Sequence, residues 1–200
     1  MWLDDEDDGP YLPPAPIVQS ASAPFDYDAA QEQLYYKFFK KSGSRLRAGV
    51  ATDYGDRTDY QPGVWYSFDN DTSKYDTSAS HFSAAKDPLA NALYLVNKRL
   101  RFHLIAPDWA PGPMYAYNNE IKTALSALAD ADDEFVMTKV VSDRVVTDFG
   151  EHEVTLPHFS IVDMLKPSDY IKQALKQLPP KSPWTGEVMS PENKTIIDSL

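Results

Sequence analysis

The chain has 200 residues, 42% of them hydrophobic, which is enough apolar material for the core of one domain with tails. Its formal net charge of −11 disfavours binding to nucleic acid, and the absence of cysteine excludes disulfides and thiolate zinc sites. No apolar stretch is long enough to predict a membrane-spanning helix, and the N-terminus lacks the basic-then-apolar order of a secretion signal. We therefore expect a soluble protein that is neither secreted nor transmembrane.

Residues 1–24 predict a flexible N-terminal arm. Five acids at positions 4–8 are followed by five prolines among small residues, and few large apolar side chains are present to offset the entropy of ordering. Such segments favour the polyproline-II conformation in which many partners bind peptides, although a solvated tail is the alternative. The arm residues that we expect to contact a partner are Tyr11, Leu12, Pro13, Pro14, Pro16 and Pro24.

The first element after the arm is predicted to be a helix over 28–41. Asp28 is a good N-cap, the charges at the two ends match the helix dipole, and Gly43 can end the helix. The density of aromatic residues leaves a strand as the alternative. Strands are then predicted at 45–51 and 64–68, and the polar residues 69–80 predict a loop.

The clearest helix signal is Asp87-Pro88, an N-cap followed by proline at the first helical position. This helix is expected to run to about Arg99. Alternating apolar and polar residues predict a strand at 100–106, on which His103 would be exposed, and three prolines predict an irregular loop at 107–113.

Three further helices and a block of strands complete the pattern. Apolar side chains at helical spacing mark helices that begin near Asn118 and at Ser168, and Ser190 with Pro191 begins a short one. Strands are predicted at 134–142, 143–149 and 151–162, in the manner of a meander. This mixture predicts an α+β fold with a mostly antiparallel sheet and three to four amphipathic helices. We expect a single domain at 25–178 and a C-terminal tail at 179–200.

No catalytic or cofactor motif is found, since phosphate loops, nucleophile elbows and dinucleotide fingerprints are absent. His152 and His158 suggest a metal pair, but Pro157 disrupts the strand register between them. Three aspartates within 53–59 suggest calcium, but the stretch lacks the glycine and terminal glutamate at the fixed positions of an EF-type loop, and aspartates beside Gly55 are typical of turns. We therefore predict no catalytic residue, no cofactor and no metal site.

A group of cations, which we call the basic collar, follows the acidic arm. It has five cations within eleven residues and no acid: Lys37, Lys40, Lys41, Arg45 and Arg47. Cations beside aromatic residues such as Phe38 and Phe39 can contact an anionic lipid surface. The alternative is a solvated helix end that the arm neutralises.

The order of these segments resembles that of rhabdovirus matrix proteins, of the vesicular stomatitis and rabies type. The resemblance is carried by DDEDDGPYLPPAPI, SASAPFD and EQLYYKFFKK, and the stretches KRLRFHLIAP and DDEFVMTKVV are similar in texture to the central strands of that family. It implies a compact α+β domain whose arm recruits host budding machinery through PPxY or P-(S/T)-A-P motifs. Here PPAP at 13–16 lacks the tyrosine, ASAP at 21–24 has alanine for the first proline, and the chain is acidic where the family is usually basic.

We expect a noncatalytic structural or assembly protein, most concretely viral and matrix-like or capsid-associated, in the virion or the host cytoplasm. Its expected partners are further copies or another structural protein, a host factor through the arm, and an anionic membrane surface through the collar. Nucleic acid is not expected. The alternatives are a small enzyme whose site no motif reveals and an adaptor that binds one partner with its body and another with its arm.

Overall fold

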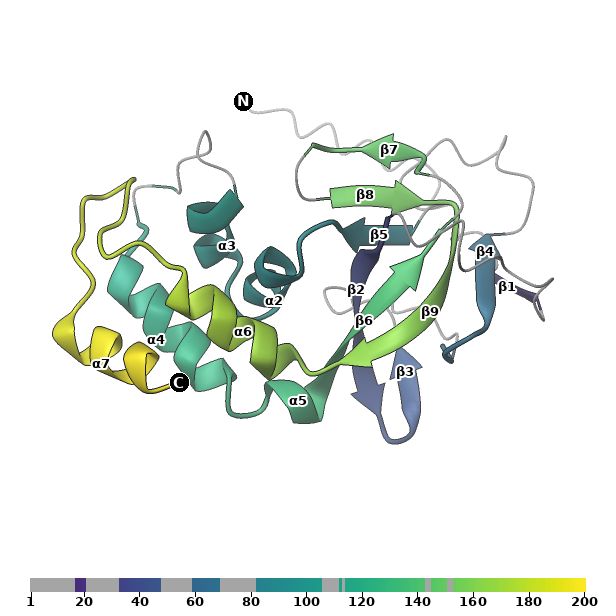
Figure 1. The fold of residues 1–200 in the computed structure, drawn as a ribbon, viewed down its shortest axis with the longest axis horizontal. Coiled ribbons are helices and arrows are strands. Elements are labelled where there is room, and N and C mark those ends of the chain that lie inside the picture. Colours follow the sequence, from purple (N-terminus) through teal and green to yellow (C-terminus); the bar gives the residue numbers. More distant parts are fainter. Residues whose placement is uncertain are drawn as a thin grey trace, which may run out of the picture.

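A computed structural model gives the fold of the chain as helices beside a curled antiparallel sheet (Figure 1). The residues that it describes are 17–20, 33–47, 59–68, 82–105, 112, 114–142, 145–150 and 153–200. The α+β class predicted from the mixture of elements is confirmed. In the described part of the chain, no helix has the length and apolar character that crossing a membrane requires.

The sheet has nine strands in the order β1-β4-β9-β6-β2-β5-β8-β7, with β3 paired to β2 outside this path. All neighbouring strands pair antiparallel. The strands are β1 (Ile17–Ser20), β2 (Tyr35–Ser42), β3 (Arg45–Arg47), β4 (Trp65–Phe68), β5 (Phe82–Ala85), β6 (Phe135–Val141), β7 (Thr147–Asp148), β8 (Glu153–Leu156) and β9 (His158–Leu165). Strand β2 is central, because β6 pairs along one of its edges while β5 and β3 share the other.

The sheet curls around a cluster of aromatic side chains. Phe159 of β9 lies at its centre, with ring centroids 5.6 Å from Tyr66 of β4 and 4.7 Å from Phe82 of β5. Strands β4 and β5 lie on opposite sides of the sheet centre, so only a curled sheet brings both rings to Phe159. The buried members of this aromatic cluster are Tyr35, Phe39, Tyr60, Tyr66, Phe82, Ala84, Val136, Val140, Val154, Leu156, Phe159 and Ile161.

The helix predicted at 28–41 is wrong where it can be compared, because Tyr35–Ser42 forms β2 and the strand alternative holds. Both faces of this strand are covered: Phe39 packs in the aromatic cluster, and Phe38 packs against the helices. A central strand covered on both sides loses the alternation of apolar and polar residues that identifies a strand. Gly43, expected to end the helix, has φ of 62° and begins the two-residue turn from β2 to β3.

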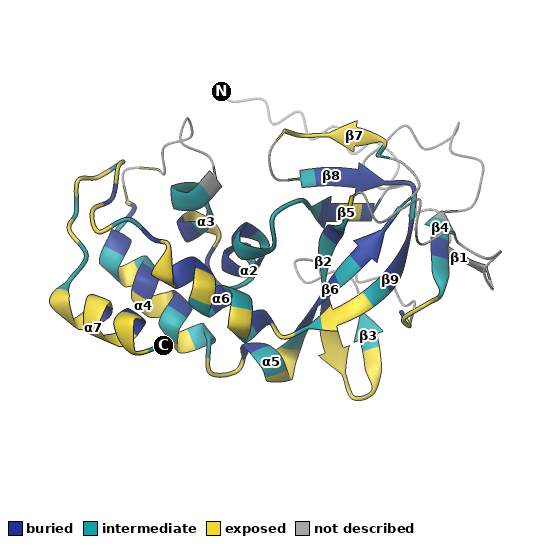
Figure 2. Cartoon of the chain, in the orientation of Figure 1, coloured by how far each residue is buried: buried dark blue, intermediate teal, exposed yellow. Residues whose placement is uncertain are grey.

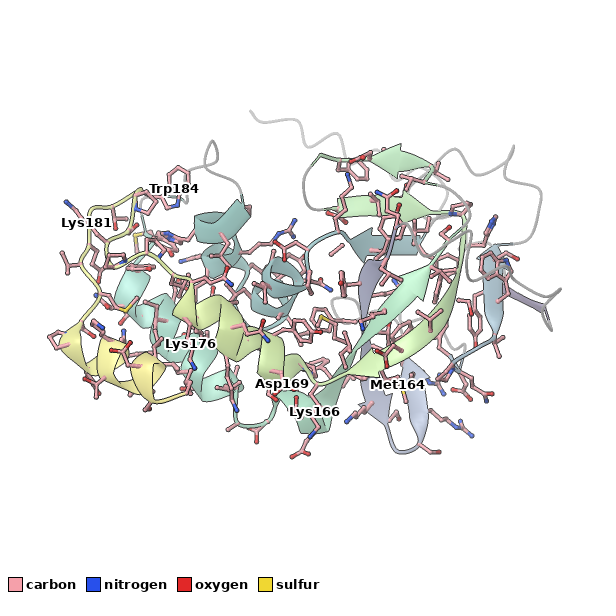
Figure 3. All side chains as sticks on the ribbon, viewed as in Figure 1. Met164, Lys166, Asp169, Lys176, Lys181 and Trp184 are labelled. Atoms are coloured by element: carbon pink, nitrogen blue, oxygen red, sulfur yellow. The ribbon has the colours of Figure 1, made fainter. Side chains whose placement is uncertain are left out.

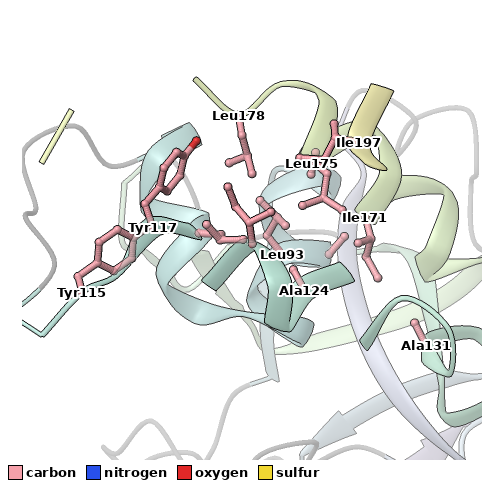
Figure 4. Packing of buried hydrophobic residues seen from close by; sticks show 13 residues of the cluster. Leu93, Tyr115, Tyr117, Ala124, Ala131, Ile171, Leu175, Leu178 and Ile197 are labelled. Carbon is pink, nitrogen blue, oxygen red and sulfur yellow. The ribbon is translucent and has the colours of Figure 1, made fainter. Parts of the chain in front are cut away.

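The helices are α2 (Pro88–Val96), α3 (Lys98–Ile105), α4 (Tyr117–Ala127), α5 (Ala131–Glu134), α6 (Pro167–Lys176) and α7 (Pro191–Ser199). The helices predicted from Asp87-Pro88, near Asn118, from Ser168 and after Ser190 are confirmed. Their apolar faces meet in a helical cluster whose buried residues include Leu93, Tyr117, Ala124, Ile171, Leu175 and Ile197 (Figure 4). Ile197 lies in α7, so residues 179–200, which we expected to be a tail, pack against α4 and α6 (Figure 2).

The strand predicted at 100–106 is wrong, because Lys98–Ile105 forms α3. Leu100 and Leu104 lie four residues apart and both contact the helical cluster, which a helix allows. Asn97 separates α2 from α3: its backbone N–H donates to the carbonyl of Leu93, and its side chain accepts from the N–H of Arg99 at 3.0 Å. Asn97 therefore ends one helix and caps the next.

The strands expected at 134–142, 143–149 and 151–162 do not form a simple meander. The first is confirmed as β6. Of the described residues of the second, Thr147–Asp148 alone is strand, and the third divides at Pro157 into β8 and β9. Strand β8 pairs with β5 and β7, whereas β9 pairs with β4 and β6. The chain thus crosses the curled sheet at Pro157. Strand β4 confirms the prediction at 64–68, and β3 covers the described part of the prediction at 45–51.

Candidate functional site

A hollow of about 540 Å³ opens at one end of the curled sheet, and we call it the sheet-end hollow. It lies where the β2–β3 turn, the segment before β4, the start of β6 and the β9–α6 junction meet. Met164 and Lys166 mark that junction in Figure 3. The apolar side chains of Leu46, Tyr60 and Val136 line it and also pack in the aromatic cluster. The floor of the hollow is therefore the end of the sheet core.

Two lysines and one aspartate give the sheet-end hollow its charge. Lys41 of β2 donates to the backbone carbonyl of Asp132 at 2.5 Å, and Lys166 is exposed just before α6. Both carboxylate oxygens of Asp132 accept hydrogen bonds from Ser168, at 2.9 Å from its N–H and 2.5 Å from its hydroxyl. Within the described residues neither lysine forms an ion pair with a carboxylate. The lysines therefore supply a positive charge that this aspartate only partly offsets.

The basic collar is divided between the two faces of the β2–β3 hairpin. Lys37 and Lys41 lie on the same face of β2 as Phe39, which is the face of the aromatic cluster. Lys37 donates to the carbonyl of Ser83 at 2.8 Å. The remaining three, Lys40, Arg45 and Arg47, point to the other face, because strand pairing places Lys40 opposite Arg47. Both arginines form ion pairs with Asp59, at 3.4 and 3.0 Å. Of the five collar residues, the structure brings only Lys41 into the sheet-end hollow.

The arm residues expected to bind a partner, namely Tyr11, Leu12, Pro13, Pro14, Pro16 and Pro24, lie outside the described residues. The part of the arm that is described is β1, which pairs antiparallel with β4 and occupies one end of the strand order. Ile17 faces Phe68 and Ser20 faces Trp65 in this pairing. A segment predicted to be separate from the fold therefore contributes a strand to the sheet.

A hydrogen-bonded pair, His103 and Tyr115, is a feature that the sequence did not reveal. His103 lies in α3, half-buried against the rings of Tyr115 and Tyr117, and its Nε2 is hydrogen-bonded to the Tyr115 hydroxyl. Burial lowers the pKa of His103 from 6.5 to about 4, and burial raises the pKa of Tyr115 well above its usual value. The prediction of an exposed histidine on a strand is wrong, because 98–105 forms a helix. The apolar residues Leu100 and Leu104, four positions apart, were the signal in the sequence that could have indicated this helix.

Next to this pair, Glu187 ties the C-terminal segment to α4. Its carboxylate accepts from the N–H of Tyr117 at 2.7 Å and from the side-chain amide of Asn118 at 2.7 Å. Burial raises the pKa of Glu187, but these hydrogen bonds outweigh it and lower the pKa below the usual value. Glu187 thus caps α4, whose N-cap residue Ala116 has no side-chain acceptor. We interpret this network as structural.

The other residues weighed for metal binding do not form a metal site in the described part of the chain. His158 lies with its ring 5.0 Å from that of Trp65, Asp59 pairs with arginines, and His152 lies outside the described residues. Among the described residues, no group of three or more histidine, aspartate or glutamate side chains is placed to hold a metal ion. The loops expected at 69–80 and 107–113 lie outside the described residues, apart from Gly112.

Comparison of the chain with protein-family models, with curated proteins and with solved structures finds no match. Within the described residues, the sheet edge at β1 and the sheet-end hollow are the two features that bear on function.

Proposed function

We propose that this chain is a noncatalytic assembly protein whose N-terminal segment joins subunits by adding a strand to a sheet. The observation that carries this proposal is β1: it comes from the acidic, proline-rich segment and pairs with β4 at the edge of the sheet. Main-chain hydrogen bonds provide most of the attraction when a strand is added to a sheet edge, so such docking makes few demands on side chains. A viral matrix-like protein is the concrete form of the proposal, and the resemblance carried mainly by the N-terminal arm supports that form.

The length of the chain between β1 and β2 allows β1 to pair within one subunit or with a neighbour. Residues 21–34 separate the two strands. These fourteen residues can span up to roughly 46 Å when extended. Strands β1 and β2 lie four places apart in the strand order, a separation of roughly 19 Å across a sheet. Exchange of β1 between copies would therefore link subunits without changing the fold of each body.

Introduced cysteines test this proposal directly, because the chain has none of its own. Val18 faces Ser67 in the β1–β4 register, at a separation that a disulfide can bridge. We expect an equimolar mixture of the single variants Val18→Cys and Ser67→Cys to give a covalent heterodimer on oxidation. The control is Val18→Cys mixed with Ser126→Cys, an exposed position on α4, which should crosslink far less.

Two results would overturn the proposal. The first is a double Val18→Cys/Ser67→Cys variant that forms only an internal disulfide while the mixed single variants stay monomeric. The second is a wild-type chain that sediments as a monomer at every concentration and shows no sheets, tubes or shells by electron microscopy. If the chain assembled but the mixed single variants formed no β1–β4 crosslink, the assembly role would stand, and strand exchange through β1 would be excluded as its cause.

A further inference from the structure

The sheet-end hollow combines apolar walls with a positive rim. Leu46, Tyr60 and Val136 form the inner part, and Phe135 and Leu165 are half-buried around it. Met164, which also lines the hollow, is 53% exposed although its side chain is apolar. Small-molecule sites are typically concave, mostly apolar and between about 300 and 1,000 Å³, and the mouth of a barrel-like sheet is a common place for them.

The charge at the mouth selects the kind of ligand. Lys41 and Lys166 line the rim and make it positive, although the formal net charge of the whole chain is −11. Lys41 uses one of its N–H donors on the carbonyl of Asp132, so two donors remain on its ammonium group. The Asp132 carboxylate is engaged by Ser168 through both oxygens. A hollow lined by two lysines and by apolar side chains suits an anionic head on an apolar chain.

We propose that the sheet-end hollow binds a small amphipathic anion, namely an aliphatic chain that ends in a carboxylate. The chain would cover Leu46, Val136 and Met164, and the carboxylate would accept hydrogen bonds from Lys41 and Lys166. A charge-assisted hydrogen bond is stronger than a neutral one, and the apolar walls exclude part of the water that competes for it. This site lies within one body and does not depend on the assembly proposed above.

Titration calorimetry with decanoate as the probe tests the proposal. We expect one decanoate per chain, binding that weakens with added salt, and much weaker binding of butyrate, which lacks most of the apolar chain. Decyltrimethylammonium has the same chain length with a cationic head and should bind at least tenfold more weakly. Equal binding of the two decyl compounds would overturn the anionic selectivity, and the absence of decanoate binding would overturn the site.

Substitutions at the rim locate the ligand. Lys41→Gln and Lys166→Gln should each weaken decanoate binding about fivefold, which corresponds to about 1 kcal/mol for the loss of one ammonium group near an anion. The matched control is Lys176→Gln, because Lys176 is an exposed lysine at the other end of α6 (Figure 3). Met164→Ser should also weaken decanoate binding, while thermal unfolding without ligand stays unchanged because Met164 is exposed. A Lys41/Lys166 double variant that binds like the wild type would overturn the proposal.

Anionic vesicles decide whether the ligand is a free molecule or a membrane. Vesicles containing phosphatidylserine present anionic heads at a surface, and the collar residues Arg45 and Arg47, which form ion pairs with Asp59, lie on the other face of the hairpin. We expect free decanoate to bind in the absence of vesicles. Binding to vesicles alone, with no decanoate binding, would assign the lysines to a membrane surface and overturn a small-molecule site.

Discussion

The helical part and the sheet have cores made of different kinds of side chain. The helical cluster consists mainly of alanine, leucine and isoleucine, whereas tyrosine and phenylalanine dominate the aromatic cluster of the sheet. Small aliphatic residues let helices approach closely, and large rings fill the wider interior of a curled sheet. Helices α2 and α7 carry start signals in the local sequence, while the sheet depends on contacts such as that between Thr138 and Lys37, 101 positions apart. Local sequence therefore marks the starts of these two helices, and long-range packing determines the sheet.

The sharpest test of this contrast is Phe159→Ala, at the centre of the aromatic cluster. Phe159 is fully buried and its ring contacts those of Phe39, Tyr60, Tyr66 and Phe82. We expect the substitution to lower the free energy of unfolding by about 3–5 kcal/mol, measured by urea denaturation. Phe149→Ala is the matched control, because Phe149 is 62% exposed and should cost less than about 0.5 kcal/mol. Similar losses at the two positions would contradict the aromatic cluster as the core of the sheet.

The helical counterparts are Leu93→Ala and Leu175→Ala. Both leucines are fully buried in the helical cluster, and each substitution should cost about 2–5 kcal/mol. Leu125→Ala should cost less, because Leu125 is only half-buried beside that cluster. Urea denaturation, monitored in parallel by far-ultraviolet circular dichroism and by the circular dichroism of the aromatic side chains, shows whether the helical part and the sheet unfold together. If Leu125→Ala cost as much as the other two, the assigned face of α4 would be wrong.

The same contrast explains what the sequence could predict. Asp87-Pro88 and Ser190-Pro191 are local signals, and both helices begin where they indicate, with side-chain oxygens that accept from backbone N–H groups. The helix predicted at 28–41 is wrong where strand β2 forms, because a central strand covered on both faces shows no period of two that would identify it. The sheet-end hollow was beyond prediction, since Lys41 and Lys166 meet only after β2 and the β9–α6 junction have been placed.

His103, in the helical part, should make the free energy of unfolding depend on pH. Its folded pKa of about 4 lies below the unfolded value of 6.5, so the folded state binds the proton less readily. The contribution of neutral His103 is complete above pH 6.5 and is lost as pH falls toward 4, by about 2–3 kcal/mol. Urea denaturation at several pH values should show this loss in the wild type.

The control for this prediction is His103→Gln, which removes the titrating group while keeping a polar partner for Tyr115. Carboxylates with lowered pKa, such as Glu187 and Asp148, also reduce stability as pH falls, so the difference between variant and wild type is the informative quantity. We expect that difference to change between pH 6.5 and 4 and to be constant above 7. A constant difference over the whole range would mean that His103 titrates in the folded protein as it does in the unfolded chain.

The smallest expected effects come from the helix caps, which test whether local signals alone stabilise the helices. Asp87 accepts from the N–H groups of Leu89 and Ala90 at 2.8 and 3.3 Å, and Ser190 accepts from that of Asn193 at 3.2 Å. Asp87→Ala and Ser190→Ala should each cost about 1 kcal/mol, measured by thermal unfolding. Asp87→Asn and Ser190→Thr keep an acceptor oxygen and should restore most of the loss. A loss that these variants did not restore would come from a contact other than the cap. If the alanine variants cost nothing, packing of α2 and α7 against the helical cluster would outweigh their caps, and the start signals would mark these helices without stabilising them.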